Sequence, residues 1–219
     1  MEPAVPTDGV HLNFNFDRGS FGLIAGTLTF RHRINSHWAY SLWANRTHSR
    51  GDYPFTLHYT VSGHDSTSRE RREHSSMVAT TLEGNLFWNG NHQNLLFKVR
   101  HSESDHELPG PVVYYAKRGT EFTSYRNIFL QGRYRNQLSD RWNLQVLGKW
   151  SHLFDTYSDT ASLKNIYNEY RQQEGYLSAA LAYEPIDRLT FTLTTDEALA
   201  VLHSNLQHHN AVTRFTSQE

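Results

Sequence analysis

The stretch VATTLEGNLFWNGNHQNLLFKVR, residues 78–100, decides the fold. On either side of its NGNHQ centre, apolar and polar residues alternate. The apolar set is Val78, Leu82, Leu86, Trp88, Leu95, Phe97 and Val99, and the polar set is Thr81, Glu83, Asn85, Lys98 and Arg100. Side chains of a β-strand alternate between two faces, so this period of two predicts two amphipathic strands. The short, Gly-containing connection between them predicts an antiparallel hairpin.

The same alternation recurs along most of the chain. Seven further segments carry it: HLNFNF, GLIAGTLTFRHR, WAYSLWAN, NIFLQGRYR, RWNLQVLGKW, YLSAALAY and LTFTLTT. The segment VTRFT, near the end, begins another. We therefore predict an all-β protein with about nine to ten antiparallel strands.

Short and long connections alternate between these strands. The short ones are RINSHW, WNGNHQN, RNQLSDRW and EPIDRL; the long polar stretches are residues 46–76, 102–122 and 154–173, with a smaller one near 203–210. The link DRGS departs from this order because it is short where a long one is expected. Short turns at one end and long loops at the other are typical of an outer-membrane β-barrel, with periplasmic turns and extracellular loops.

The composition of the two faces supports a membrane barrel over a soluble β-domain. Aromatic residues of the apolar faces lie within a few residues of a short turn: Trp38, Tyr40, Trp88, Tyr134, Trp142 and Tyr183. Charged residues fall on the opposite face: Glu83, Lys98, Arg100, Arg133, Arg135 and Lys149. This pattern predicts an aromatic belt at the lipid interface and a polar lumen. A soluble barrel would turn its charges outward into water.

The overall composition excludes several classes of protein. The formal charge is −1 and there are no cysteines, which argues against a nucleic-acid-binding face and against a disulfide framework. No window approaches the ~18 apolar residues of a membrane-spanning helix. Residues 1–10 resemble no signal peptide and are interpreted as a lead-in to the first strand. Aromatic residues make up 13% of the chain, which is typical of a folded protein.

Three segments resemble TonB-dependent outer-membrane receptors, especially the Bacteroidota-type branch that includes cobalamin and siderophore receptors. They are THSRGDYPFTLHY, HSESDHELPGPVVYY and YRQQEGYLSAALAYEPIDRLTFTLTTD. In that family a plug domain sits inside a 22-stranded barrel. The resemblance implies that GDYPF (Gly51 to Phe55) starts an extracellular loop and that LPGPVVY (Leu108 to Tyr114) lies in the next one.

The resemblance covers residues 11–219, which would form only part of such a barrel. Neither a plug domain nor a TonB-contact box is recognisable. We therefore expect further strands after Glu219 and another segment before Met1, since an open sheet edge in lipid leaves backbone groups unsatisfied. The alternative is a small closed barrel of eight or ten strands.

Candidate ligand-binding residues are tyrosines of the long stretches: Tyr114, Tyr115, Tyr157, Tyr167 and Tyr170. The run HSESDHE, residues 101–107, has residue types that bind metals, but an extended segment scatters them over two faces. It is interpreted as a solvated loop, and no metal, cofactor or catalytic constellation is predicted. ELPGPVVYY, residues 107–115, is expected to fold back over the barrel mouth.

Three functions follow as hypotheses. The first is part of a TonB-dependent receptor in the outer membrane, importing a scarce bulky nutrient such as siderophore-iron or cobalamin. Its partners would be outer-membrane lipid, lipopolysaccharide, the nutrient and, through the missing plug region, TonB. The second is a non-transporting barrel, such as an adhesin or assembly module. The third is a soluble ligand-binding β-barrel. None of the three is an enzyme or binds nucleic acid.

Overall fold

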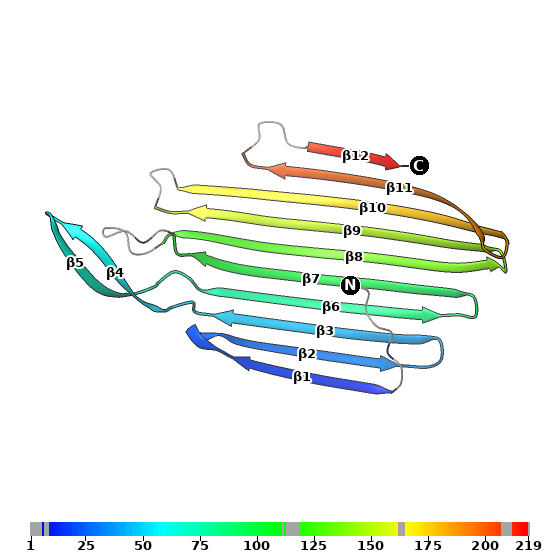
Figure 1. Ribbon diagram of the computed structural model, residues 1–219, viewed down its shortest axis with the longest axis horizontal. Coiled ribbons are helices and arrows are strands. Elements are labelled where there is room, and N and C mark those ends of the chain that lie inside the picture. The colour runs from blue at the N-terminus through cyan, green and yellow to red at the C-terminus, as the bar shows by residue number, and fades with distance from the viewer. Residues whose placement is uncertain are drawn as a thin grey trace.

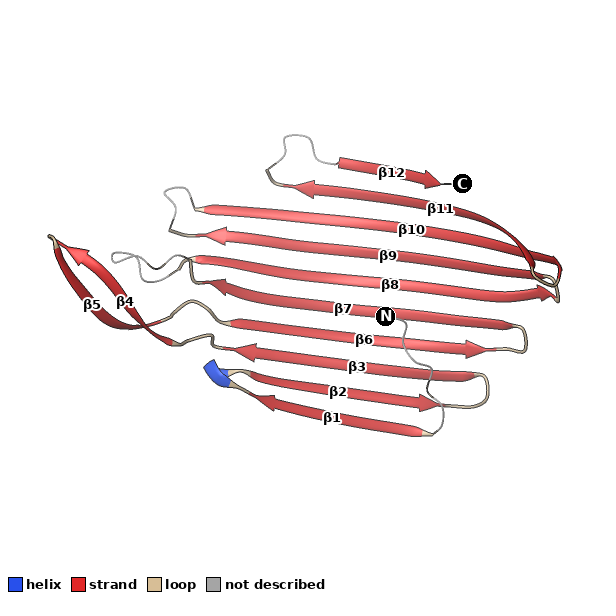
Figure 2. Ribbon diagram, viewed as in Figure 1, coloured by secondary structure: helices blue, strands red, loops and turns tan. Residues whose placement is uncertain are grey.

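The protein, seen in a computed structural model, consists almost entirely of long antiparallel strands (Figure 1). The structure describes residue 6 and residues 9–110, 112, 119–161, 165–206 and 212–218, the last range by its backbone alone. The only helical segment in these ranges is a 3-10 turn, Ser20–Gly22, between the first two strands (Figure 2). No helix among the described residues is long and apolar enough to cross a membrane.

All ten segments predicted from the alternation are strands, which confirms the all-β prediction. The strands are β1 (Val10–Arg18), β2 (Ile24–Arg33), β3 (Trp38–Ser49), β4 (Pro54–Val61), β5 (His64–Arg71), β6 (Met77–Asn89), β7 (Gln93–Leu108), β8 (Glu121–Ser139), β9 (Trp142–Asp159), β10 (Ile166–Ile186), β11 (Leu189–Ser204) and β12 (Val212–Gln218).

Ten strands form one sheet in the order β1-β2-β3-β6-β7-β8-β9-β10-β11-β12. Each strand pairs antiparallel with its neighbours, as Figure 1 shows. The sheet is open: β1 and β12 are its two edges, and they do not pair with each other in the described part of the chain. The alternative of a closed barrel of ten strands is therefore not what these residues form.

The prediction that the long polar stretches are loops is wrong for most of their length. β7 runs to Leu108, β9 runs to Asp159, and β8 and β10 already begin at Glu121 and Ile166. Ladder hydrogen bonds join backbones and do not require an apolar side chain, so a strand continues where both of its faces become polar. Sequence alternation marks where a strand becomes amphipathic, not where it ends.

The stretch 46–76 contains a separate hairpin, β4–β5, that projects from the end of the sheet (Figure 1). Its two-residue turn, Ser62 and Gly63, has positive φ at both positions (51° and 79°). This is the geometry of the tight hairpin turn whose twist matches that of paired strands. The Ser-Gly dipeptide was the sequence signal for this hairpin.

The predicted apolar faces lie on one side of the sheet and stay exposed. Cross-strand pairs such as Leu86 with Phe97 and Leu181 with Leu193 place apolar residues in register. Exposed fractions reach 68% for Leu12 and 71% for Leu193. A sheet normally buries its apolar face against a second layer. The described residues supply no such layer, so this face must meet something else.

The buried core is correspondingly small. Ala39, Phe87 and Leu96 are its apolar members, and register places them side by side on β3, β6 and β7. They lie on the polar face of the sheet, which also holds buried Ser41 and Asn85. Conversely, Glu197 is a charged residue on the apolar face, where it pairs with Leu177.

Candidate functional site

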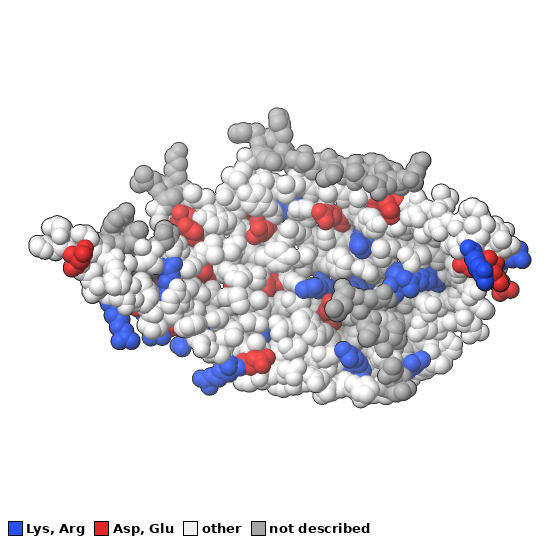
Figure 3. Space-filling view, viewed as in Figure 1, with Lys and Arg blue, Asp and Glu red and all other residues white. Residues whose placement is uncertain are grey.

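The polar face of the sheet gathers the ionisable side chains that alternate with the apolar ones. Figure 3 shows this face, where Lys and Arg side chains cluster over the middle strands and acidic side chains lie near them toward β10 and β11. Its strands carry Glu83, Lys98, Arg100, Arg133, Arg135, Lys149, Glu174 and Asp196. The six charged residues that were predicted to lie opposite the apolar side chains all lie on this face, and this face is the candidate site.

One network holds the carboxylate of Glu83. Lys98 Nζ lies 3.0 Å from Glu83 Oε2, and the two side chains are only 14% and 18% exposed. Asn85 Nδ2 donates to Glu83 Oε1 and to Ser41 Oγ, both at 3.1 Å. Both oxygens of Glu83 are therefore engaged. A partly buried charge is tolerated when it is paired and hydrogen-bonded in this way.

A second group links β9, β10 and β11. Lys149 Nζ lies 5.1 Å from the centre of the Tyr176 ring, within cation–π range. The Tyr176 hydroxyl donates to Asp196 Oδ1 at 2.7 Å. The cation, the ring and the carboxylate form a chain across three strands, which fixes the orientation of Tyr176.

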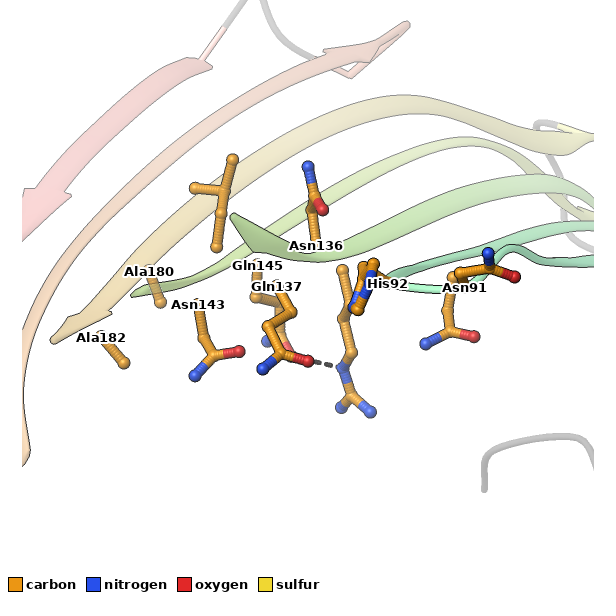
Figure 4. A pocket seen from close by; sticks show the side chains of 11 residues that line it. Asn91, His92, Asn136, Gln137, Asn143, Gln145, Ala180 and Ala182 are labelled. Carbon is orange, nitrogen blue, oxygen red and sulfur yellow. Dashed lines mark hydrogen bonds between the residues drawn. The ribbon is translucent and has the colours of Figure 1, made fainter. Parts of the chain in front are cut away.

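Near the short turns, this face holds a cavity of about 480 Å³ lined mostly by carboxamides (Figure 4). Asn91, Asn143 and Gln145 point into it from the hollow side of the curved strands. Arg135 Nε donates to Gln145 Oε1 at 2.7 Å. Carboxamides carry both donors and acceptors, so this lining suits a neutral polar surface.

Toward the loop end, a second cavity of about 500 Å³ has a different character. Lys98 and Arg100 of β7 line it together with Tyr125, Asn127 and Phe129 of β8. Sequence reasoning assigned Lys98 and Arg100 to the polar face but did not single out the two rings. The period-two pattern of β8 could have identified these rings. Tyr125 and Phe129 are an even number of residues from Gln131, so all three side chains lie on the same face.

The five predicted ligand tyrosines are not brought together. Tyr157 and Tyr170 belong to the polar face, as their register with Thr123 and Asp155 shows. Tyr167 lies on the opposite face, where it is 53% exposed and donates to Glu169 Oε2 at 3.3 Å. It is three residues from Tyr170, and an odd spacing along a strand puts two side chains on different faces.

These tyrosines lie on strands rather than in loops, so the expected loop placement of Tyr157, Tyr167 and Tyr170 is corrected. Tyr114 and Tyr115 lie outside the described residues, as do Pro111 and Val113 of the stretch 107–115 that was expected to fold back. Within that stretch, Glu107 and Leu108 end β7, and Gly110 O accepts a hydrogen bond from the buried guanidinium of Arg72.

Titratable groups at the loop end of β9 lie beyond the apolar band and perturb one another. Partial burial raises the pKa of the Tyr157 hydroxyl, and the carboxylates of Glu121 and Asp159 add to that rise. Hydrogen bonds from Thr120 Oγ1 (2.6 Å) and Ala161 N (2.9 Å) lower the pKa of the Asp159 carboxyl. The raised pKa keeps the Tyr157 hydroxyl protonated, and the lowered pKa keeps the Asp159 carboxyl ionised.

The run 101–107 is strand, so its interpretation as a loop is wrong, but its side chains do scatter over two faces. His101, Glu103 and Asp105 lie on one face and His106 on the other. His101 Nε2 lies 3.7 Å from Glu103 Oε2. No group of three or more metal-ligating side chains occurs among the described residues.

Comparison with known proteins adds no family assignment: neither the models of protein families nor the curated proteins gave a match.

Proposed function

We propose that this chain is part of the wall of an outer-membrane β-barrel, in a TonB-dependent receptor that imports a scarce bulky nutrient. The observation that carries the barrel is the single-layered sheet with one exposed apolar face and one charged face. A transmembrane barrel needs this arrangement, because its outer face meets lipid and its inner face meets water or a plug. An open strand edge in lipid is costly, so the wall would be completed by further pairing at β1 and β12.

Strand length supports a wall that continues past the membrane. A tilted strand crosses a bilayer with about 9–11 residues. β10 has 21 residues and β8 has 19, which is close to twice that number. On β8, apolar residues occupy the outer face from Tyr134 to Ile128, next to the short turn. The remainder, toward the loop end, would stand above the lipid.

The upper border of the apolar face carries charges in register. Arg46, Glu103, Arg126 and Arg171 occupy one row across the sheet. Arg171 Nε lies 2.7 Å from Glu169 Oε1, and its guanidinium lies 5.4 Å from the centre of the Phe154 ring. Arginines at this height match the phosphates of outer-membrane lipid and lipopolysaccharide, which accept bidentate hydrogen bonds.

The lower border carries aromatic rings close to the short turns. Trp142 and Tyr183 stack with ring centres 4.3 Å apart, and the Trp38 and Trp88 ring centres are 6.4 Å apart. Amphipathic rings are favoured at the level of lipid headgroups. A charged upper border and an aromatic lower border would together position the sheet in the membrane.

Receptor function, the nutrient and the TonB partner rest on the resemblance of residues 11–219 to that family. The polar face supports it in one respect: its charges are arranged to contact a polar occupant of the lumen. The proposed location is the bacterial outer membrane, and neither catalysis nor nucleic-acid binding forms part of the proposal.

Single-tryptophan variants of the chain in lipid vesicles test the barrel orientation. Trp142 lies on the apolar face and Trp43 on the polar face. With the other tryptophans changed to Phe, brominated lipids should quench Trp142 strongly and Trp43 weakly, because quenching requires contact with acyl chains. Acrylamide added from water should give the reverse order. Equal quenching of both positions by lipid would contradict the proposal.

A further inference from the structure

The cavity near the loop end of the polar face is lined by two cations, Lys98 and Arg100, and by one carboxylate, Glu103. Glu103 belongs to the opposite face of β7, where its Oε2 lies 3.7 Å from His101 Nε2. Glu83 is the carboxylate directly opposite Arg100 on β6. Its two oxygens are already engaged by Lys98 and Asn85. Among the described residues, the Arg100 side chain has no ion pair or hydrogen bond, and it is exposed. No described residue therefore pairs with the Arg100 guanidinium, which is positioned to pair with an anion that enters the cavity.

Aromatic surface lies beside this cation. Phe129 is the direct neighbour of Arg100 on β8, and Tyr125 lies four residues further along β8 toward the loop end. Both rings line the cavity of about 500 Å³. A ring and a guanidinium on adjacent strands can contact the flat face and the charged group of one molecule together.

Hydrogen-bond groups complete the cavity wall. Asn127 Nδ2 donates to the Tyr125 hydroxyl oxygen at 3.1 Å, which leaves the proton of that hydroxyl available to a ligand. Asn127 Oδ1 is buried and has no partner in the described part of the chain. Ser102 and Ser104 add two hydroxyls to the lining. Most of these groups donate, as recognition of an anion requires.

We infer that this cavity binds an anion that carries a flat ring, such as an aromatic carboxylate, through Arg100 and the face of Phe129. The inference rests on the proposed function only in placing the cavity on the route of an imported nutrient. Asp155 of β9 pairs with Tyr125 and lies outside the lining. It would repel a second negative charge, which favours a ligand with one anionic group.

Three small molecules separate the contributions of charge and ring: 2-naphthoate, uncharged 2-naphthylmethanol, and acetate. Equilibrium dialysis of the full chain in detergent micelles, against micelles alone, should show 2-naphthoate bound more tightly than either of the others. Arg100→Gln should weaken 2-naphthoate binding roughly tenfold, since it removes a charge-assisted hydrogen bond. Arg100→Lys should retain most of the affinity. Phe129→Leu should weaken it roughly two- to tenfold.

Arg135→Gln is the matched control, because Arg135 is an exposed arginine on the same face that lines the other cavity. Its affinity for 2-naphthoate should equal that of the unaltered chain. Equal binding of 2-naphthoate and 2-naphthylmethanol, or equal losses from Arg100→Gln and Arg135→Gln, would overturn the inference. Each variant is first shown to keep the circular dichroism of the folded sheet.

The binding and quenching experiments have independent outcomes. If the chain binds 2-naphthoate selectively but lipid quenches Trp43 and Trp142 alike, the binding site is supported and the barrel proposal is contradicted. If lipid quenches Trp142 more strongly than Trp43 but 2-naphthoate binding does not depend on Arg100, the barrel proposal is supported and the binding site is contradicted.

Discussion

At the scale of single residues, the polar face depends on charges that are paired across strands. Glu83 and Lys98 are neighbours on a diagonal of β6 and β7, with the carboxylate held by Asn85 as well. Both are less than a fifth exposed, so neither charge can be fully hydrated if its partner is removed. Breaking such a pair costs more than replacing both members.

A double-mutant cycle on this pair gives a prediction for stability. Lys98→Gln should lower the free energy of unfolding by about 1–3 kcal/mol, because it leaves the Glu83 carboxylate without its cation. Adding Glu83→Gln should recover part of that loss. Urea unfolding of the chain in vesicles measures both values. Additive losses in the double variant would show that the two charges do not depend on each other.

At the scale of elements, the β4–β5 hairpin is joined to the sheet at its base. Arg71 donates two hydrogen bonds to Asp52 Oδ2, at 3.1 Å from Nε and 2.8 Å from Nη2. Ser75 Oγ donates to Gly51 O at 2.9 Å. Asp52, Gly51 and Ser75 lie in the connections that flank the hairpin, and Arg71 is the last residue of β5. β4 and β5 pair with each other and not with the ten-stranded sheet.

Replacing residues 54–71 with a short Gly-Ser linker should therefore leave the sheet intact. β3 and β6 pair directly from Trp38 with Trp88 to Ser49 with Met77, so their ladder does not depend on the hairpin. Amide hydrogen exchange of β3 and β6 in micelles measures the outcome. The same linker in place of residues 166–174, which belong to β10, is the contrasting variant and should expose the β9 ladder. Loss of protection in β3 after hairpin removal would show that the hairpin stabilises the sheet.

At the scale of the whole molecule, the extent of the exposed apolar face is the reason for proposing that lipid covers it. Many large apolar side chains on this face are more than a third exposed, among them Phe14, Leu42, Phe97, Leu177 and Phe191. Apolar surface of this extent marks a region that another phase or partner covers. Burial contributes about 25 cal/mol per Å² of apolar surface removed from water.

The purified chain should accordingly aggregate in detergent-free buffer and become monodisperse in micelles. Size-exclusion chromatography with light scattering measures both states, with micelles alone as the reference. A monodisperse, folded chain without detergent would support the hypothesis of a soluble β-barrel and contradict the membrane proposal.

The amphipathic strands could be predicted from sequence because their signal is local. Alternation in NLLFKVR or RWNLQVLGKW assigns each side chain to a face without knowledge of any partner strand. The hairpin β4–β5 was missed because β5 is polar throughout, although Phe55, Leu57, Tyr59 and Val61 alternate along β4 and the Ser62–Gly63 turn follows them. The pairing of Tyr125 and Phe129 with Ser104 and Arg100 depends on register, which no single segment encodes.

The sequence by itself determined the strand class, the two faces and the antiparallel order, because side-chain direction follows from backbone geometry alone. Only the tertiary structure decided how far the strands extend, which tyrosines share a face and which cation has no carboxylate partner among the described residues. Those properties come from hydrogen-bond register between strands, where a shift of one residue turns every side chain to the other face. Register joins residues far apart in the chain, so local pattern cannot fix it.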